Sequence, residues 1–141
     1  MKNRPDYSPA SFAFAHHCEL HAAGDEAIRN GNISEARKFF QVALEYYPKD
    51  SDTWRALGNC YAAMNKLRKA EECFRRALQF VDAESIADIN FDLGNCLYDQ
   101  EKYAEAVQFY LQVPPGSTVW REAARSILLA KKMLSDEKAS S

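Results

Sequence analysis

The chain has 141 residues, a formal net charge of −2 and a pI near 5.9, and 47% of its residues are hydrophobic. This length suits a single domain that buries a core of its own, so a disulfide scaffold is not required. The acidic balance gives no general attraction to a phosphate backbone, and nucleic acid is therefore not expected as a partner.

The cysteines and the hydrophobic runs indicate where the protein resides. Cys18, Cys60, Cys73 and Cys96 stand far apart without a CxxC pair, which is typical of reduced thiols in a cytoplasmic protein. The apolar part of the N-terminus, SFAFA, is too short for a signal peptide core. No stretch approaches the roughly 20 apolar residues of a membrane span. We expect a cytoplasmic protein without a membrane segment.

We expect a flexible segment over residues 1–8, followed by a first helix from about Pro9 to Asn30. Ser8 and Pro9 read as the cap and first turn of this helix. Cys18, His21 and Asp25 share one of its faces, and side chains of these types could hold a zinc ion. A metal-dependent enzyme at these three residues is therefore one alternative, and polar lining of a groove is the other.

Internal repetition is the strongest pattern in the sequence. A glycine recurs at one phase, followed twelve residues later by an alanine and four residues after that by an aromatic residue, at intervals of 34 and then 36 residues. The members of the three copies are Gly24, Ala36 and Phe40, then Gly58, Ala70 and Phe74, then Gly94, Ala106 and Tyr110. Such a period predicts an all-α solenoid of helix pairs. Because glycine costs about 1 kcal/mol inside a helix, its repeated use predicts the close approach of another helix backbone, with the alanines as the opposite wall.

These residues resemble the tetratricopeptide repeat (TPR). The second copy keeps most of the pattern: Trp54, Leu57, Gly58, Tyr61, Ala70, Phe74 and Ala77. The resemblance implies a right-handed solenoid of antiparallel pairs, one TPR domain over residues 9–135. Its repeats would be 17–50, 51–84 and 87–118, closed by a helix at about 118–135, with a disordered tail at 136–141. Pro114 and Pro115 should cut the last repeat short.

The resemblance also implies where a partner binds. Members of this family hold an extended peptide or a helix in the concave groove formed by the first helix of each pair. Mapped onto this chain, the predicted site is His21, Asp25, Arg29, Arg55, Asn59, Ala62, Phe91, Asn95 and Tyr98. The amides of Asn59 and Asn95 could grip a peptide backbone, and Phe91 and Tyr98 could serve as rigid anchors unless they pack within the domain.

One subfamily clamps the C-terminal carboxylate of heat-shock chaperones with lysine, asparagine and arginine side chains. The corresponding places here hold His21, Asp25, Ala56, Asp88 and Asp92. Three acidic side chains would repel a carboxylate, so an acidic C-terminal tail is a poor ligand and a basic or mixed basic and apolar segment fits better.

The sequence thus predicts a protein-protein interaction module, an adaptor without enzymatic activity or cofactor. A cytoplasmic chaperone resembling those of type III secretion translocators is an alternative, and the metal-dependent enzyme at Cys18, His21 and Asp25 is a less favoured one. A homodimer formed through SFAFA or through the basic stretch 66–76 also stays open.

Overall fold

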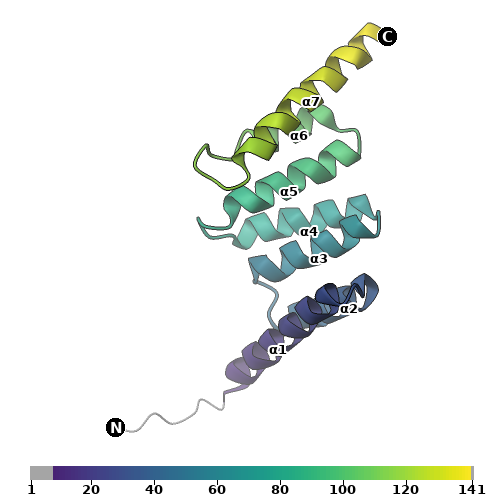
Figure 1. Cartoon of the computed structure of the whole chain (residues 1–141). Coiled ribbons are helices and arrows are strands. Elements are labelled where there is room, and N and C mark those ends of the chain that lie inside the picture. Colours follow the sequence, from purple (N-terminus) through teal and green to yellow (C-terminus); the bar gives the residue numbers. More distant parts are fainter. Residues whose placement is uncertain (1–7, 141) are drawn as a thin grey trace.

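The structure, a computed structural model, describes residues 8–140 and consists of α-helices stacked along one axis (Figure 1). The helices are α1 (Pro9–Arg29), α2 (Ile33–Tyr46), α3 (Ser51–Ala63), α4 (Leu67–Phe80), α5 (Ile86–Asp99), α6 (Tyr103–Tyr110) and α7 (Trp120–Ser140). No strand occurs within residues 8–140, so the predicted all-α solenoid of helix pairs is confirmed. The segment predicted to be flexible, 1–8, lies outside this range except for Ser8.

An aromatic ring covers the glycine of every pair. A β-carbon placed on Gly58 would lie 2.7 Å from Phe74 Cε1, and one on Gly94 would lie 2.6 Å from Tyr110 Cε1. Gly24 stands in the same relation to the ring of Phe40. The prediction that a helix backbone fills this space was therefore wrong, because the ring from the second helix occupies it.

The turn inside each pair uses one backbone motif. Gly31, Asn65 and Glu101 occupy the same place in the three pairs and all have positive φ angles. Each is followed by an amide that bonds a carbonyl five residues earlier, as in Asn32 to Ala27 at 2.8 Å and Lys66 to Tyr61 at 2.8 Å. This is the Schellman ending of a helix, and it turns the chain back sharply enough for the pair to be antiparallel.

The C-terminal end differs from the prediction in two details. As expected, α6 is short: it stops at Tyr110, ahead of Pro114 and Pro115. However, α7 begins at Trp120 rather than near 118, and it continues to Ser140. Residues 136–140 are therefore helical instead of disordered, because SDEKAS contains no glycine or proline to end the helix.

The closing helix α7 packs in the register of the earlier first helices. Its buried residues are Ala123, Ile127 and Ala130, each 34 residues after a buried residue of α5: Ile89, Leu93 and Cys96. The helix therefore covers α6 as a first helix covers the preceding pair. Its outer side carries the exposed basic residues Arg121, Arg125, Lys131 and Lys132, but Leu128 is also 70% exposed there.

The N-terminal aromatic residues are incompletely packed. Phe12 and Phe14 are both 52% exposed, although the ring of Phe14 meets the ring of Tyr47 edge-on at 5.6 Å. Association of two chains through this stretch stays a prediction. Within residues 8–140, the longer helices are too polar to cross a membrane.

The ring-over-glycine contact gives the first prediction. Gly58→Leu would force a side chain into the ring of Phe74, and overpacking of this kind costs about 3 kcal/mol. We expect a clear drop in melting temperature, measured by circular dichroism. Gly116→Leu is the matched control, because no atom lies within 4 Å of a β-carbon at that position. Equal melting temperatures for the two variants would contradict the role of this contact.

Candidate functional site

The predicted site residues all lie on accessible parts of the first helices. Arg29 and Asn59 are exposed, and the other seven are half-buried: His21, Asp25, Arg55, Ala62, Phe91, Asn95 and Tyr98. The buried positions of the same helices, such as Gly24, Leu57 and Leu93, face the cores of the pairs. We call the accessible side of α1, α3 and α5 that carries these residues, together with Asp52, Asp88, Asp92 and Asp99, the first-helix face.

A histidine network fixes the N-terminal end of this face. His17 is buried, and its Nδ1 donates to the carbonyl of Ala43 at 2.9 Å while its Nε2 donates to Asp50 Oδ2 at 2.8 Å. Thr53 also donates its hydroxyl to Asp50. The network ties α1 to the end of α2 and the start of α3.

The electrostatics of Asp50 follow from this network. Burial by itself raises the pKa of Asp50, but the hydrogen bonds from Thr53 and His17 lower it by a larger amount. The pKa of Asp50 therefore lies below its ordinary value. Sequence reasoning missed this residue. The available signal was its position, since Asp50 stands directly before the first residue of α3, where a polar side chain often caps a helix.

The three candidate metal ligands do not form a metal site. His21 Nδ1 donates to Thr53 Oγ1 at 2.7 Å, and His21 Nε2 lies 3.4 Å from Asp25 Oδ2. Cys18, His21 and Asp25 do line one hollow of about 310 Å³ between α1 and the start of α3. However, residues 8–140 contain no group of three or more His, Cys, Asp or Glu side chains that could hold an ion. The metal-dependent enzyme therefore has no geometric basis in this part of the chain.

In the middle of the face, Arg55 is tied to two acidic residues of the next repeat. Its Nε donates to Asp92 Oδ2 at 2.6 Å, and its Nη1 lies 3.9 Å from Asp88 Oδ2. Burial raises the pKa of Asp92, and the contact with Arg55 opposes this only in part. The cation of Arg55 is thus already neutralised, and the cluster keeps an acidic surplus.

The two predicted aromatic anchors are backed by buried tyrosines. The ring of Phe91 lies 6.0 Å from the ring of Tyr110, and the ring of Tyr98 meets Tyr103 edge-on at 5.0 Å. Each anchor therefore packs inward on one side and stays half-buried on the other. Such support holds an aromatic side chain in place before a ligand arrives.

The two asparagines differ in their surroundings. Asn95 Oδ1 accepts a hydrogen bond from the hydroxyl of Tyr110 at 2.7 Å, and burial raises the pKa of Tyr110 to about 12. The amide oxygen of Asn95 is therefore committed to the core, whereas its N–H groups can still donate to a ligand. Asn59 is exposed and lies beside Asp92.

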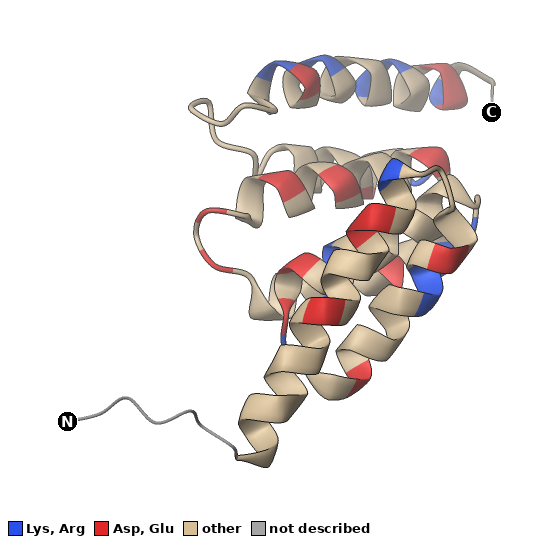
Figure 2. Ribbon diagram, turned by 60° about the horizontal axis from the view of Figure 1, so that its bottom comes forward, with Lys and Arg blue, Asp and Glu red and all other residues tan. Residues whose placement is uncertain are grey.

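Charge divides sharply between the two kinds of helix. Helices α1, α3 and α5 contain seven acidic and two basic residues, a net charge of −5 without the histidines. Helices α2 and α4 contain four acidic and six basic residues, a net charge of +2. Figure 2 shows further basic bands along α7 at the C-terminal end. The first-helix face is therefore acidic, although the chain as a whole is nearly neutral.

Comparisons with known proteins agree with this geometry. Tetratricopeptide repeat profiles match residues 27–85 and 61–118. The general transcriptional corepressor ssn6 of Schizosaccharomyces pombe is 31% identical over 100 residues, which are 63% of this chain and 9% of that protein. The type IV pilus assembly protein PilF of Pseudomonas aeruginosa is 30% identical over 98 residues, which are 70% of this chain and 38% of that protein. The chain thus spans well under half the length of these relatives.

Solved structures share the fold. The first TPR of Spaghetti (RPAP3), bound to the HSP90 peptide SRMEEVD, superposes with a TM-score of 0.75 at 18% identity, covering 86% of this chain and 98% of that one. The TPR2B domain of yeast Sti1 in complex with pHsp70 has a TM-score of 0.77 at 13% identity, and the match covers 84% of this chain and 98% of that one. The MamA protein has a TM-score of 0.78 at 17% identity, and the match covers 88% of this chain and 68% of that one.

The histidine network predicts an acid-sensitive contribution to stability. Because the pKa of Asp50 is lowered in the folded state, the contribution is fully present above the unfolded-state pKa near 3.9 and is lost as the pH falls through the folded-state value. Asp50→Asn should lower the free energy of unfolding at pH 7 and flatten its fall between about pH 5 and pH 2. Urea titrations at several pH values measure this. The exposed Asp136→Asn should leave the curve unchanged; the same flattening in that variant would remove Asp50 from the explanation.

The different surroundings of Asn95 and Asn59 predict that their replacement by alanine lowers the free energy of unfolding by different amounts. Asn95→Ala leaves the buried hydroxyl of Tyr110 without this acceptor, and we expect a loss of about 1 kcal/mol in the free energy of unfolding. The exposed Asn59→Ala should cost less than about 0.5 kcal/mol. Chemical denaturation of both variants tests this, and equal losses would show that the oxygen of Asn95 is not committed to the core.

Proposed function

This chain belongs to the tetratricopeptide repeat family, and on that premise we propose that it is a non-enzymatic interaction module whose first-helix face holds a basic or mixed basic and apolar segment of a partner protein. The observation that supports the ligand class is the net charge of −5 on α1, α3 and α5. A face of one sign attracts partners of the opposite sign and rejects those of the same sign.

The distribution of the acidic residues supports this further. Asp25, Asp52, Asp88 and Asp99 come from all three first helices, so the potential extends along the stack instead of marking one point. Arg55 does not reverse it, because Asp92 and Asp88 bind its guanidinium. An extended or helical segment with several lysine or arginine side chains would meet one acidic group on each successive helix.

The ligand that we propose differs in charge from the peptide bound in one comparison structure. The peptide SRMEEVD in the RPAP3 complex carries two glutamates, an aspartate and only one arginine. In this chain the places of a carboxylate clamp hold His21, Asp25, Ala56, Asp88 and Asp92. An acidic tail would meet three carboxylates there, so a ligand of the opposite charge is the better match.

Apolar contacts would add specificity to the charge. Phe91 and Tyr98 are accessible on one side and held by Tyr110 and Tyr103 on the other. Aromatic side chains that are fixed in this way lose little rotamer freedom on binding, which favours them as anchors. The N–H groups of Asn95 can donate to a carbonyl of the bound segment.

Charge reversal on the first-helix face tests the proposal. The probes are two short fluorescein-labelled peptides that alternate leucine with lysine or leucine with glutamate, and fluorescence anisotropy reports their affinity. We expect the lysine peptide to bind the wild type and the glutamate peptide to bind this face far more weakly. The double variant Asp52→Lys with Asp99→Lys should lower the affinity for the lysine peptide roughly 5- to 30-fold, because two exposed charges are inverted.

The control carries the same change in charge elsewhere. Asp136→Lys with Glu137→Lys alters two exposed acidic residues at the far end of α7. If this control lowered the affinity for the lysine peptide as much as Asp52→Lys with Asp99→Lys does, only the net charge of the chain would matter and the proposed site would be wrong. Undiminished binding of the lysine peptide to Asp52→Lys with Asp99→Lys would remove the ligand class.

A further inference from the structure

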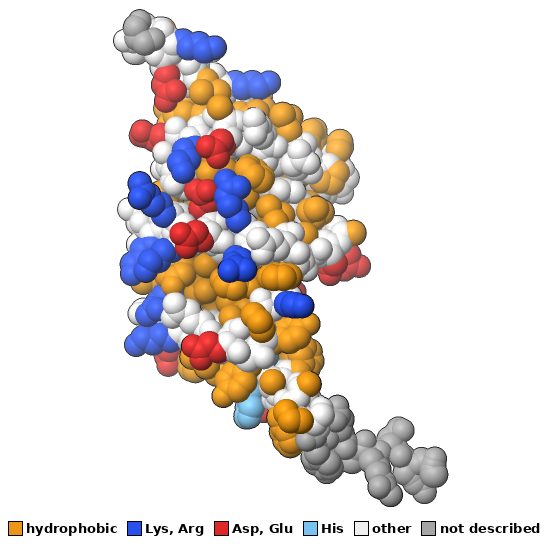
Figure 3. All heavy atoms as spheres, turned by 180° about the vertical axis from the view of Figure 1, so that it is seen from behind, with side chains coloured by type: hydrophobic (Ala, Val, Ile, Leu, Met, Phe, Trp, Pro, Cys, Tyr) orange, Lys and Arg blue, Asp and Glu red, His pale blue; other side chains and the backbone are white. Residues whose placement is uncertain are grey.

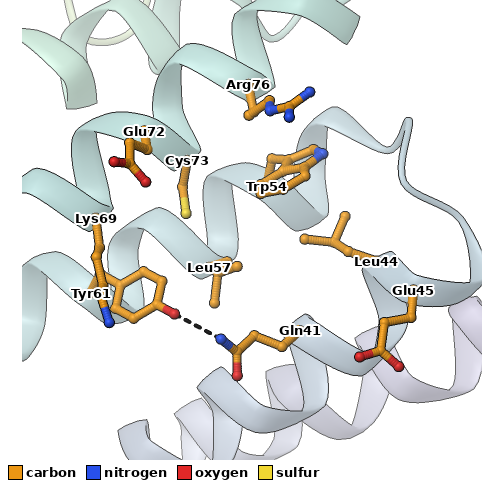
Figure 4. Close-up of a pocket in the computed structure, with 10 residues that line it drawn as sticks. All are labelled: Gln41, Leu44, Glu45, Trp54, Leu57, Tyr61, Lys69, Glu72, Cys73 and Arg76. Carbon is orange, nitrogen blue, oxygen red and sulfur yellow. Dashed lines mark hydrogen bonds between the residues drawn. The ribbon is translucent and has the colours of Figure 1, made fainter.

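An open pocket lies on the other side of the stack, between two consecutive second helices. It is formed by α2, α3 and α4, has a volume of about 520 Å³, and we call it the α2–α4 pocket (Figure 4). Its hydrophobic lining consists of Leu44, Trp54, Leu57, Tyr61 and Cys73. Figure 4 shows the sulfur of Cys73 directed into the space between the rings of Trp54 and Tyr61. The volume lies within the usual range of ligand pockets, about 300–1,000 Å³.

The repeat itself explains why this pocket is open. In the next groove along the stack, between α4 and α6, Cys73 and Gln41 each have an equivalent one repeat later. Phe109 on α6 stands 36 residues after Cys73, and Arg75 on α4 stands 34 residues after Gln41. There the guanidinium of Arg75 stands over the ring of Phe109 at 5.3 Å. The groove between α4 and α6 is thus filled by side chains at the positions where the α2–α4 pocket has a small thiol and an amide.

The walls of the pocket are held before any ligand binds. Trp54 Nε1 donates to the carbonyl of Pro48 at 2.7 Å, and Gln41 Nε2 donates to the hydroxyl of Tyr61 at 2.8 Å. Burial raises the pKa of Cys73 to about 12, so its thiol stays neutral and behaves as a small apolar group rather than a nucleophile. The pocket is therefore built to receive an apolar group, and thiol chemistry is not its use.

Two cations flank the aromatic lining of the pocket. At the rim, Lys69 Nζ lies 5.6 Å from the ring centre of Tyr61, and the guanidinium carbon of Arg76 lies 5.7 Å from that of Trp54. Neither cation has an ion-pair partner within residues 8–140, whereas Arg75 binds Glu71 and Glu105. Glu45 and Glu72 also reach the rim, so the four charged lining residues balance, and the net charge of +2 on α2 and α4 comes from residues of these helices outside the lining. Figure 3 shows hydrophobic side chains across the middle of the molecule seen from behind, with basic side chains along one edge.

We propose that the α2–α4 pocket is a second docking site, separate from the first-helix face, for an acidic segment of a partner protein that inserts one leucine or phenylalanine side chain. The apolar side chain would fill the space between Trp54, Leu57 and Cys73, as Phe109 fills the next groove. Carboxylates beside it would meet Lys69 and Arg76. The two docking surfaces would thus select partners of opposite charge.

Nuclear magnetic resonance of the full chain tests the location. The probe is a short peptide of glutamate and aspartate with one central leucine-phenylalanine pair, and its control replaces that pair with two serines. The chain contains two tryptophans, so the indole N–H signal of Trp54 can be followed beside that of Trp120 on α7. We expect the acidic apolar peptide to shift the Trp54 signal and leave the Trp120 signal in place. No shift of Trp54 at millimolar peptide would overturn the proposal.

Filling the pocket tests the mechanism. Cys73→Phe places at this position the residue that the next repeat already carries. The variant should lower the affinity for the acidic apolar peptide at least tenfold, measured by fluorescence anisotropy, and leave the melting temperature unchanged. Cys18→Phe is the matched control, because Cys18 is exposed on α1, away from the pocket. Undiminished binding to Cys73→Phe, or equal binding of the serine control peptide, would contradict the insertion of an apolar side chain.

A second variant covers the case in which Cys73→Phe does not fold. Lys69→Glu with Arg76→Glu changes only exposed rim residues. It should lower the affinity for the acidic apolar peptide and raise the affinity for a lysine peptide of the same design. Asp52→Lys with Asp99→Lys should leave the acidic peptide in the pocket, so failure at one surface is distinguishable from failure at the other. A concentration-dependent dimer that Cys73→Phe abolishes would instead assign the pocket to a second copy of the chain and overturn the proposal.

Discussion

The contact of an aromatic ring with a glycine inside each helix pair governs the rest of this structure. Phe40, Phe74 and Tyr110 each occupy the space that a side chain at Gly24, Gly58 or Gly94 would need. This contact fixes the rotation of the first helix about its own axis. Because one residue turns a helix by about 100°, a slip by a single position would bury the polar side chains of the first-helix face and expose the core.

Once this rotation is fixed, the stack acquires two chemically different sides. The accessible positions of α1, α3 and α5 are rich in aspartate, whereas α4 carries four exposed cations, more than any other helix of the three pairs. The ion pairs between neighbouring helices, Arg55 with Asp92 and Arg75 with Glu105, run within each side and do not cancel the difference. The two sides of the stack therefore differ in charge, although the chain as a whole is nearly neutral.

The polar residues near the N-terminus serve this arrangement. His17, Asp50 and Thr53 connect α1, the end of α2 and the beginning of α3 in one network. The cluster of histidine, cysteine and aspartate in the sequence resembles a metal site only when the first helix is considered alone. In the folded chain, Thr53 and Asp25 bind His21, and the buried ring of His17 acts as a structural link between repeats.

The sequence by itself determined the helices, their antiparallel pairing, the period of 34 and 36 residues and the set of accessible positions, because the helical period and the turn motif are local and repeat along the chain. Only the tertiary structure decided that a ring covers each glycine, that Asp92 binds Arg55, that Tyr110 uses the oxygen of Asn95, and that a pocket opens above Cys73. These features depend on how side chains from different helices fill a shared space. A spacing pattern shows which residues face inward, but the volume and hydrogen-bonding groups of every neighbour determine which of them meet.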